Sequence, residues 1–443
     1  MRVTVSMLVL VVLFCGVSTA EAAVTSNGSF IVTRLNNSQP IITEEMFEAV
    51  GATNKNAAGM AEGQNINGPS AIRIPDWIAP ANRADPNAIY YLYFAHHRGD
   101  YIRMAFSDDI EGPWQLYNVG ISVPLDSRGV LSLNRYDKID IGNDITIYNH
   151  IASPDVFVDD DNQRIILYFH GPTRYGGTNV GQNSFVATSE YGLDFNGNIE
   201  TVILGGSYFR VFSYNDNLYA LDNGADLYKA LDADNPWTPP RSFDFGDDLW
   251  IKSSNDPFQD DLSEAGFSGR VRHTAVHLIG DMLQVFYSRI GDTPERIQMS
   301  TIDLSVGSYD LWDSTYPPEE ILEAEPSWEG GQFPPDPSKS GHAPEKVNQL
   351  RDPYVFEDID GVLYLFYSGC GEDAIGIARL DSVAPGDFDF DGCVQPNDLA
   401  VLAVEWCQQA GELIADLDDN GKVDFVDFVI FAENWRCNSA DIE

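Results

Sequence analysis

The sequence has few basic residues, few cysteines and no long apolar segment after its N-terminus. Its 443 residues include 26 Lys and Arg against 68 Asp and Glu, a formal net charge of −42. Nucleic acid and anionic membrane surfaces would repel such a chain unless it carried a local basic patch, and the sequence shows none. No later segment is apolar over the roughly 18 residues that a membrane-spanning helix requires. We therefore expect a soluble protein with neither of these partners.

The N-terminus has the pattern of a secretory signal. Arg2 precedes an apolar run over residues 7–17, and a small-residue pattern follows at 20–22. These features predict a signal peptide over residues 1–22 and a protein that is secreted or bound to the cell surface, by bacterial-type export. The mature chain keeps four cysteines, three of them in the last 51 residues. An exported chain permits disulfides between them.

Upstream of a linker at 383–386, the chain repeats one phrase five times. Each copy has an extended apolar run, a turn rich in Asp, Asn and Gly, and then an aromatic strand. The aromatic strands lie at 90–94, 165–169, 217–221, 282–287 and 362–367. Repeated units of three or four strands predict a five-bladed β-propeller over residues 69–382, in a domain that spans 23–382. The alternative fold is a β-sandwich.

Two segments near the C-terminus, 387–398 and 416–427, have the spacing of calcium-binding loops. Side-chain oxygens recur at positions 1, 3, 5 and 12, with glycine at position 6. Ca²⁺ takes six to eight hard oxygen ligands, and glycine permits the sharp turn that directs them inward. With the position-7 carbonyls, the predicted ligands are Asp387, Asp389, Asp391, Cys393 and Asp398, then Asp416, Asp418, Asn420, Lys422 and Asp427. The alternative is two acidic turns without metal.

These loops, each followed by an apolar helix that ends at Trp406 or Trp435, resemble a type I dockerin. The resemblance covers the segment 386–438 and implies a small α-helical module, folded by two calcium ions, that docks onto a cohesin-like protein. Loop positions 10 and 11, at 396–397 and 425–426, are Pro-Asn and Phe-Val rather than the small hydroxyl pairs of the best-known dockerins. The partner type therefore stays open.

The antiparallel helices of such a module imply that its two ends meet. On this basis we expect a disulfide between Cys393 and Cys437, with unpaired cysteines as the alternative. The sequence leaves open whether the propeller holds a further cation in addition to these two calcium ions.

The strand-opening phrases at 153–156 and 351–358 resemble those of the glycoside hydrolase family 43 and 32 superfamily. The resemblance covers 69–382 and implies acidic residues on the inner strands that meet at a central cavity. Glycosidic cleavage needs two such groups, because one protonates the leaving oxygen while the other acts as base or nucleophile. The candidates are Asp155, Asp352 and Glu372.

The first blade departs from that family, because its usual Asp-Pro pair corresponds here to 67–70, Asn-Gly-Pro-Ser. Histidine could replace the missing base, since its pKa lies near neutrality, and we add His273 to the catalytic candidates. Further His and Arg residues lie at the ends of predicted inner strands, where arginine could fork onto the carboxylate of an acidic sugar. The expected substrate contacts are His96, His97, His170, Arg272 and Arg351. The alternative is that most of them satisfy turn carbonyls.

The sequence therefore predicts a secreted carbohydrate-active enzyme that hydrolyses a polysaccharide or its oligomers and is tethered by its calcium module. Two alternatives remain. The missing first-blade carboxylate favours a sugar-binding propeller without activity. A propeller phosphorylase or transglycosylase would need only one carboxylic acid.

Overall fold

The computed structural model describes residues 29–437 apart from 57–58, 235, 238–248, 260–269, 344, 390–391, 409–412 and 418–419. The predicted signal peptide lies outside the described residues. No helix in the described part is both long and apolar enough to cross a membrane.

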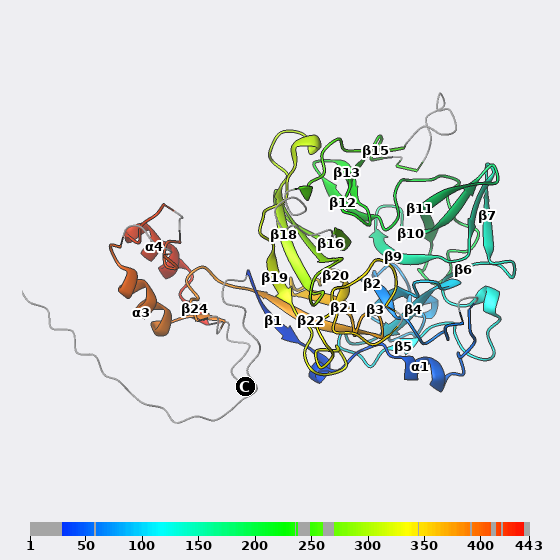
Figure 1. Cartoon of the computed structure of the whole chain (residues 1–443), viewed down its shortest axis with the longest axis horizontal. Helices are drawn as coiled ribbons and strands as arrows, with labels where there is room; N and C mark the ends of the chain where they lie inside the picture. Colours follow the sequence, from blue (N-terminus) through cyan, green and yellow to red (C-terminus); the bar gives the residue numbers. More distant parts are fainter. Residues whose placement is uncertain are drawn as a thin grey trace, which may run out of the picture.

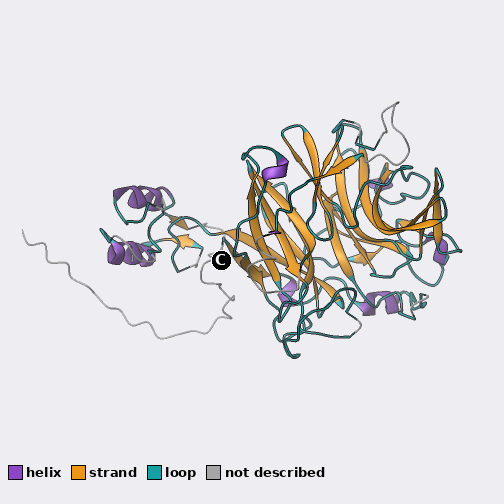
Figure 2. Cartoon of the chain, turned by 45° about the horizontal axis from the view of Figure 1, so that its top comes forward, coloured by secondary structure: helices purple, strands orange, loops and turns teal. Residues whose placement is uncertain are grey.

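Five antiparallel sheets make up most of the chain and form the five blades of a propeller (Figures 1 and 2). Blade 1 contains β2 (Asn67–Arg73), β3 (Tyr90–Ala95), β4 (Tyr101–Ser107) and β5 (Gln115–Leu116), with β6 (Leu131–Ser132) also paired to β4. Blade 2 contains β9 (Ala152–Asp159), β10 (Arg164–Tyr175), β11 (Thr178–Ser189), β8 (Ile145–Tyr148) and β7 (Lys138–Gly142). Blade 3 contains β12 (Arg210–Tyr214), β13 (Asn217–Leu221), β14 (Leu227–Ala230) and β15 (Trp250–Lys252). Blade 4 contains β16 (Val271–Ile279), β17 (Met282–Arg289), β18 (Ile297–Asp303) and β19 (Glu319–Leu322).

Blade 5 combines the two ends of the propeller chain. Its inner strands β20 (Arg351–Glu357), β21 (Leu363–Gly369) and β22 (Ala374–Ser382) come last, and the outermost strand β1 (Phe30–Arg34) comes first. Phe30 pairs with Ser382 and Arg34 with Ala378. Hydrogen bonding between the ends closes the ring and leaves no long open edge. The five-bladed prediction is confirmed, but the sequence pattern over 69–382 did not reveal β1.

A separate apolar core fills each gap between neighbouring blades. Tyr91 and Phe185 belong to the core between blades 1 and 2, whereas Leu92 and Phe366 belong to the core between blades 5 and 1. Three further cores fill the other gaps. A central strand such as β3 is therefore buried on both faces, and its sequence is continuously apolar, Tyr-Tyr-Leu-Tyr-Phe-Ala, rather than alternating.

Within the described part of the propeller domain, the helices are short and lie outside the blades. They are α1 (Glu44–Ala49) and the 3₁₀ turns η1 (Asn36–Ser38), η2 (Pro80–Asn82), η3 (Leu125–Ser127) and η4 (Tyr309–Leu311).

After β22 the chain leaves the propeller and forms two helices, α3 (Pro396–Glu405) and α4 (Phe425–Glu433), which Figure 1 shows beyond the ring of blades. They share a small apolar core that includes Leu402 and Phe431. The short strands β23 (Cys393–Val394) and β24 (Arg436–Cys437) pair antiparallel, so the residues after α4 return to the start of α3. Cys393 lies directly opposite Cys437 in this pairing, and the disulfide between them stays a prediction.

Candidate active site at the propeller axis

Each inner strand starts beside one residue in the left-handed backbone conformation. These residues are Gly68, Ser153, Tyr208, His273 and Asp352, with φ between 50° and 68°. Such a conformation is strained for residues other than glycine and recurs at functional sites. Neighbouring members touch: the rings of Tyr208 and His273 stack 4.8 Å apart, and His273 Nδ1 lies 2.7 Å from Asp352 Oδ1. We call these five residues the axial ring.

Asp352 is buried and lies among positive groups. Burial opposes its ionisation, but His273, Arg272 and Arg351 together outweigh burial and lower the pKa of its carboxyl. The paired oxygen and nitrogen belong to an Asp–His dyad, an arrangement that holds the imidazole in one orientation. The axial ring thus places one carboxylate and one imidazole at the centre of the propeller.

Glu372, in the turn between β21 and β22, is a second buried carboxylate beside the axis. Arg351 donates to its Oε1 at 2.8 Å, and Asn65 and Asn67 donate to its Oε2. His97 Nδ1 lies 3.8 Å from the same Oε2. Burial opposes ionisation of Glu372, whereas His97 and Arg351 favour it, and its pKa is lowered overall. Asp352 and Glu372 interact electrostatically and share Arg351.

A cavity of about 480 Å³ opens beside this cluster. Its wall is formed by residues that follow β3 and β8 and by one residue each from β10 and β11. The lining residues are His97, Arg98, Asp100, Asn149, His150, Pro172 and Gln182. We call it the axial cavity. His97 belongs both to its wall and to the Glu372 cluster, so the cavity and the buried carboxylates meet at this side chain.

Two groups in the cavity wall have pKa values that favour their neutral forms. Burial, helped by nearby Asp137 and Glu62, raises the pKa of Asp100 to about 6. Burial lowers the pKa of His97, although Glu372 partly opposes this shift. The Asp100 carboxyl therefore keeps its proton to a higher pH than an ordinary aspartate, and the His97 imidazole loses its proton at a lower pH than an ordinary histidine; both shifts favour the forms that acid and base catalysis need.

Six of the seven histidines gather around the axis. His150 and His170 make an edge contact, His170 stacks on Tyr208 at 4.2 Å, and His97 lies 5.7 Å from His342. His96 is buried and accepts a hydrogen bond from the Arg98 N–H at 2.9 Å, so it supports the turn. Only His277, on the outer part of β16, lies elsewhere, where it contacts Gln284 and Glu357.

Asp155 does not belong to this group. Its Oδ2 accepts a hydrogen bond from the Val211 N–H at 3.0 Å and thereby links the inner strands of blades 2 and 3. The residue two positions after each of three other axial ring members makes an equivalent link to the next blade: Ser70 to Val156, Arg210 to Thr274, and Tyr354 to Ala71. The counterpart of Asp352 in blade 2 is therefore Ser153, and Asp155 has no part in the mechanism that we propose below.

The two arginines of the axial cluster, Arg272 and Arg351, are engaged by other residues of the protein. Both guanidinium groups contact Glu295: Arg272 Nε donates at 2.7 Å, and Arg351 Nε lies 3.1 Å from Oε2. Their other nitrogens donate to Lys339 O, Gly341 O, Glu372 and Gln349. With these donors engaged inside the protein, we no longer assign the arginines to a substrate carboxylate.

Sequence reasoning missed Asp100, Glu295 and Tyr208. Asp100 follows the conspicuous pair His96-His97 by a few residues, and this proximity was the available signal. Glu295 and Tyr208 lie outside any recognisable motif, and only the fold brings them to the axis.

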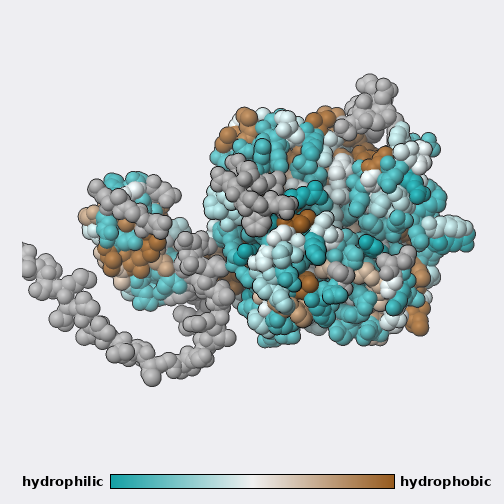
Figure 3. Space-filling view, in the orientation of Figure 1, coloured by the Kyte–Doolittle hydropathy of each residue, from teal (hydrophilic) through white to brown (hydrophobic). Residues whose placement is uncertain are grey.

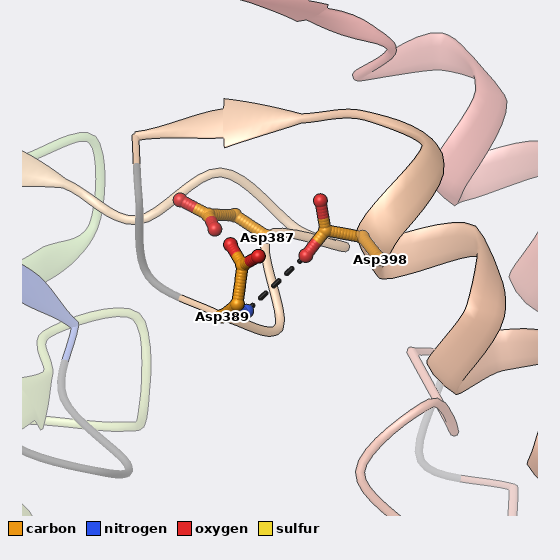
Figure 4. A group of neighbouring side chains, drawn as sticks. All are labelled: Asp387, Asp389 and Asp398. Atoms are coloured by element: carbon orange, nitrogen blue, oxygen red, sulfur yellow. Dashed lines mark hydrogen bonds between the residues drawn. The ribbon is translucent and has the colours of Figure 1, made fainter. Parts of the chain in front are cut away.

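In the first C-terminal loop, three predicted ligands converge. One oxygen from each of Asp387, Asp389 and Asp398 lies within 4.8 Å of the others. Figure 4 shows the three carboxyl groups gathered at the start of the loop and of the helix that follows it. Asp387 and Asp398 are buried, and carboxylates this close repel one another unless a cation lies among them. Gly392 has φ 86°, the conformation expected at loop position 6. This donor set fits a hard divalent cation. Asp391 lies outside the described residues.

The second loop repeats the hydrogen bonds of the first. Asp416 accepts from the Gly421 N–H at 2.7 Å, as Asp387 accepts from Gly392 at 3.0 Å. Asp427 accepts from Leu417 and Asp424, as Asp398 accepts from Phe388 and Gln395. Both loops therefore have one local architecture. Asp418 lies outside the described residues, and the ligand roles of Cys393, Asn420 and Lys422 stay predictions.

The two helices expose an apolar surface on the side away from their shared core. Its exposed members include Val404, Trp406, Phe425, Val426 and Val429. Figure 3 shows a brown area on this module.

Comparison with known proteins gives one relative in sequence and several in structure. No family model matches the chain. The uncharacterized protein R118 of Acanthamoeba polyphaga mimivirus is 33% identical over 323 residues, which cover 71% of this chain and 83% of that protein. Among solved structures, a thermostable family-43 glycoside hydrolase matches with TM-score 0.43 and 13% identity, over 75% of this chain and 92% of that one. An α-L-arabinofuranosidase from Lactobacillus brevis matches with TM-score 0.42 and 11% identity, over 71% and 90% of the two chains.

Proposed function

The chain belongs to the same family as the mimivirus protein R118, and we propose that it hydrolyses a glycosidic bond of a polysaccharide or its oligomers in the axial cavity. One observation carries this proposal. Asp100 and His97, three residues apart in sequence, both line the cavity, and burial shifts their pKa values in opposite directions, each toward the neutral form.

In this mechanism Asp100 protonates the leaving glycosidic oxygen. A carboxyl with a pKa of about 6 is protonated often enough near that pH to act as an acid, whereas an ordinary aspartate is not. The bond to the anomeric carbon breaks as the proton moves to the leaving sugar, and water completes the reaction.

His97 accepts the proton of the attacking water. Its ring lies in the cavity wall, and Glu372 lies behind its Nδ1, so the carboxylate stabilises the imidazolium that forms. Asn65 and Arg351 fix Glu372 in place. This arrangement supplies a base without the first-blade carboxylate, whose position is occupied by Gly68.

The substrate in this proposal is an uncharged sugar. Arg272 and Arg351 are engaged by Glu295 and by backbone carbonyls, and the cavity lining combines the amides of Asn149 and Gln182 with Arg98 and Asp100, one group of each charge type. Hydroxyl-rich ligands match such a lining, because each amide can both donate and accept.

A second candidate is a propeller that binds sugars without cleaving them. Its support is the axial ring, in which Asp352 is the one carboxylate and is held by His273. Both candidate functions predict that the protein binds sugars, but only the first predicts that it cleaves them.

The test is a panel of neutral plant and algal polysaccharides, with reducing ends measured for the wild type and for Asp100→Asn and His97→Ala. We expect cleavage by the wild type and a loss of about 10² to 10⁴ in each variant, with binding retained. Binding without cleavage by the wild type would favour the second candidate. Cleavage at the wild-type rate by both variants would overturn the assignment of Asp100 as the acid and His97 as the base.

We further propose that the protein is exported and that residues 386–438 form a calcium-dependent tether for a cohesin-like partner. The converging carboxylates of the first loop and the repeated hydrogen bonds of the second support two bound ions. In each loop the side chains at positions 1, 3, 5 and 12 would hold the ion. The ion would supply folding free energy to a module with a small core. The exposed apolar side chains of Phe425 and Val426 lie at the loop positions expected to face a partner.

A further inference from the structure

A second, larger cavity lies in the seam between blades 1 and 2. Its volume is about 760 Å³, and its hydrogen-bonding lining residues include Tyr117, Asn118, Asn134, Asn196, Lys138 and the carboxylates Asp126, Asp140 and Asp194, of which Asp140 pairs with Lys138. These side chains come from the residues after β5, from η3, from the turn before β7 and β7 itself, and from the loop after β11. We call it the seam cavity. Like the axial cavity, it is lined by side chains that form hydrogen bonds. Asp100 and His97, the acid and base of the proposed mechanism, do not line it.

One turn, residues 133–137, separates the two cavities. On one side, the Leu133 N–H donates to Asp100 O at 2.8 Å and the Asn149 N–H donates to Asp137 O at 2.9 Å, and both Asp100 and Asn149 line the axial cavity. On the other side, Asn134 and Lys138 line the seam cavity. The Asn134 N–H donates to Lys138 O at 3.1 Å, which closes the turn. This turn is therefore hydrogen-bonded to residues that line the axial cavity and itself contributes Asn134 to the lining of the seam cavity.

An aromatic side chain is exposed on the separating turn. Tyr136 has 65% of its surface exposed, far more than the tyrosines of the blade cores. Arg135 lies over its ring at 4.8 Å and donates to its hydroxyl at 2.7 Å, and the Asn134 side chain accepts from the Tyr136 N–H at 2.8 Å. These contacts hold the ring in a defined orientation in solvent. An exposed, oriented aromatic ring offers a flat apolar face to the C–H face of a sugar.

We propose that the seam cavity is an outlying subsite for a neutral oligosaccharide, and that Tyr136 supports the sugar chain where it crosses from the axial cavity. This inference rests on the proposed carbohydrate function of the axial cavity. The polar side chains of the seam cavity bind sugar hydroxyl groups, and the Tyr136 ring packs against a sugar unit between the two cavities. The turn at 133–137 fixes the position of Tyr136 relative to both cavities. The consequence is a preference for longer chains, because short ligands fill the axial cavity alone.

The experiment measures the binding of the full chain to a glycan array of neutral plant and algal oligosaccharides of two to eight units, followed by titration of the ligands that bind. We expect affinity to rise with length in the wild type. Tyr136→Ala should lose about three- to tenfold in affinity for the longer ligands and leave the shortest unchanged. Tyr136→Phe keeps the ring and should retain most of the gain. Tyr316→Ala, which removes a tyrosine that is 37% exposed near β19, is the matched control.

The outcomes separate the two proposals. If the wild type binds glycans but Tyr136→Ala weakens all lengths equally or none, the subsite is overturned and the axial proposal stands. If the wild type neither binds nor cleaves any glycan, the proposed function is overturned and the subsite with it.

Discussion

His97 Nδ1 lies 3.8 Å from Glu372 Oε2, so the histidine in the wall of the axial cavity has a carboxylate directly behind it. The two residues come from opposite ends of the propeller chain, one after β3 in blade 1 and the other between β21 and β22 in blade 5. The ring closure that places blade 5 next to blade 1 also assembles this pair. The predicted chemistry of the protein depends on it.

The first prediction concerns pH. Because Asp100 acts in its protonated form, kcat/KM of the wild type should fall as the pH rises above about 6, approaching tenfold per unit. His97 must be unprotonated, and its lowered pKa places the acidic limb below the usual histidine range. Asp100→Asn should lose most activity and the alkaline limb with it. Asp108→Asn, at the other end of β4, is the control. An unchanged alkaline limb in Asp100→Asn would exclude this carboxyl as the acid.

The second prediction concerns Glu295, which contacts both axial arginines. Glu295→Gln removes the carboxylate that pairs with the buried Arg272 and one of the two carboxylates that pair with the buried Arg351, and it should lower the free energy of unfolding by about 3 to 5 kcal/mol. The control is Glu320→Gln, which breaks a partly exposed pair with Arg296 and should cost less than about 1 kcal/mol. Urea denaturation at neutral pH measures both. Equal effects of the two substitutions would show that Glu295 is not an electrostatic centre.

The third prediction concerns Asp155 and its link between blades. Asp155→Ala leaves the Val211 N–H without its acceptor, which should cost about 1 to 3 kcal/mol of stability. Asp155→Asn keeps an acceptor oxygen and should retain activity. Burial raises the pKa of Asp155 to about 6, so the folded state binds this proton more tightly than the unfolded state. Its contribution to stability therefore diminishes as the pH rises from about 4 to 6. Loss of turnover in a stable Asp155→Asn variant would restore its catalytic assignment.

The fourth prediction concerns calcium. Chelation should unfold residues 386–438 and leave the propeller intact, because the five blade cores contain none of the loop ligands. Limited proteolysis with mass analysis follows the two parts separately. Asp398→Ala should reproduce the effect, whereas Glu433→Gln, at the exposed end of α4, should not. Simultaneous collapse of both parts on chelation would contradict the division into modules.

The fifth prediction concerns the cysteines of the C-terminal module. Cys393 and Cys437 occupy opposite positions of the β23–β24 pair, so a disulfide there would close the module at its two ends. Peptide mapping of the oxidised protein should recover this pair, with Cys407 as a thiol. Recovery of a Cys407–Cys437 pair would contradict the prediction.

Several features of this protein followed from the sequence alone, because they depend on short-range patterns. The five repeated phrases predicted five blades, since continuous apolar strands and Gly/Asp turns determine local structure. The loop spacing likewise placed glycine at 392 and 421, and both have the left-handed conformation that the turn requires.

Only the tertiary structure decided which residue of each phrase reaches the axis. In a regular strand, residues two positions apart point to the same side, but the left-handed residue at the start of each inner strand breaks this rule. Ser153 therefore belongs to the axial ring, whereas Asp155, two residues later, contacts the next blade. The partners of Arg272, the closure by β1 and the raised pKa of Asp100 likewise depend on residues distant in sequence, because burial and charge are properties of the assembled fold.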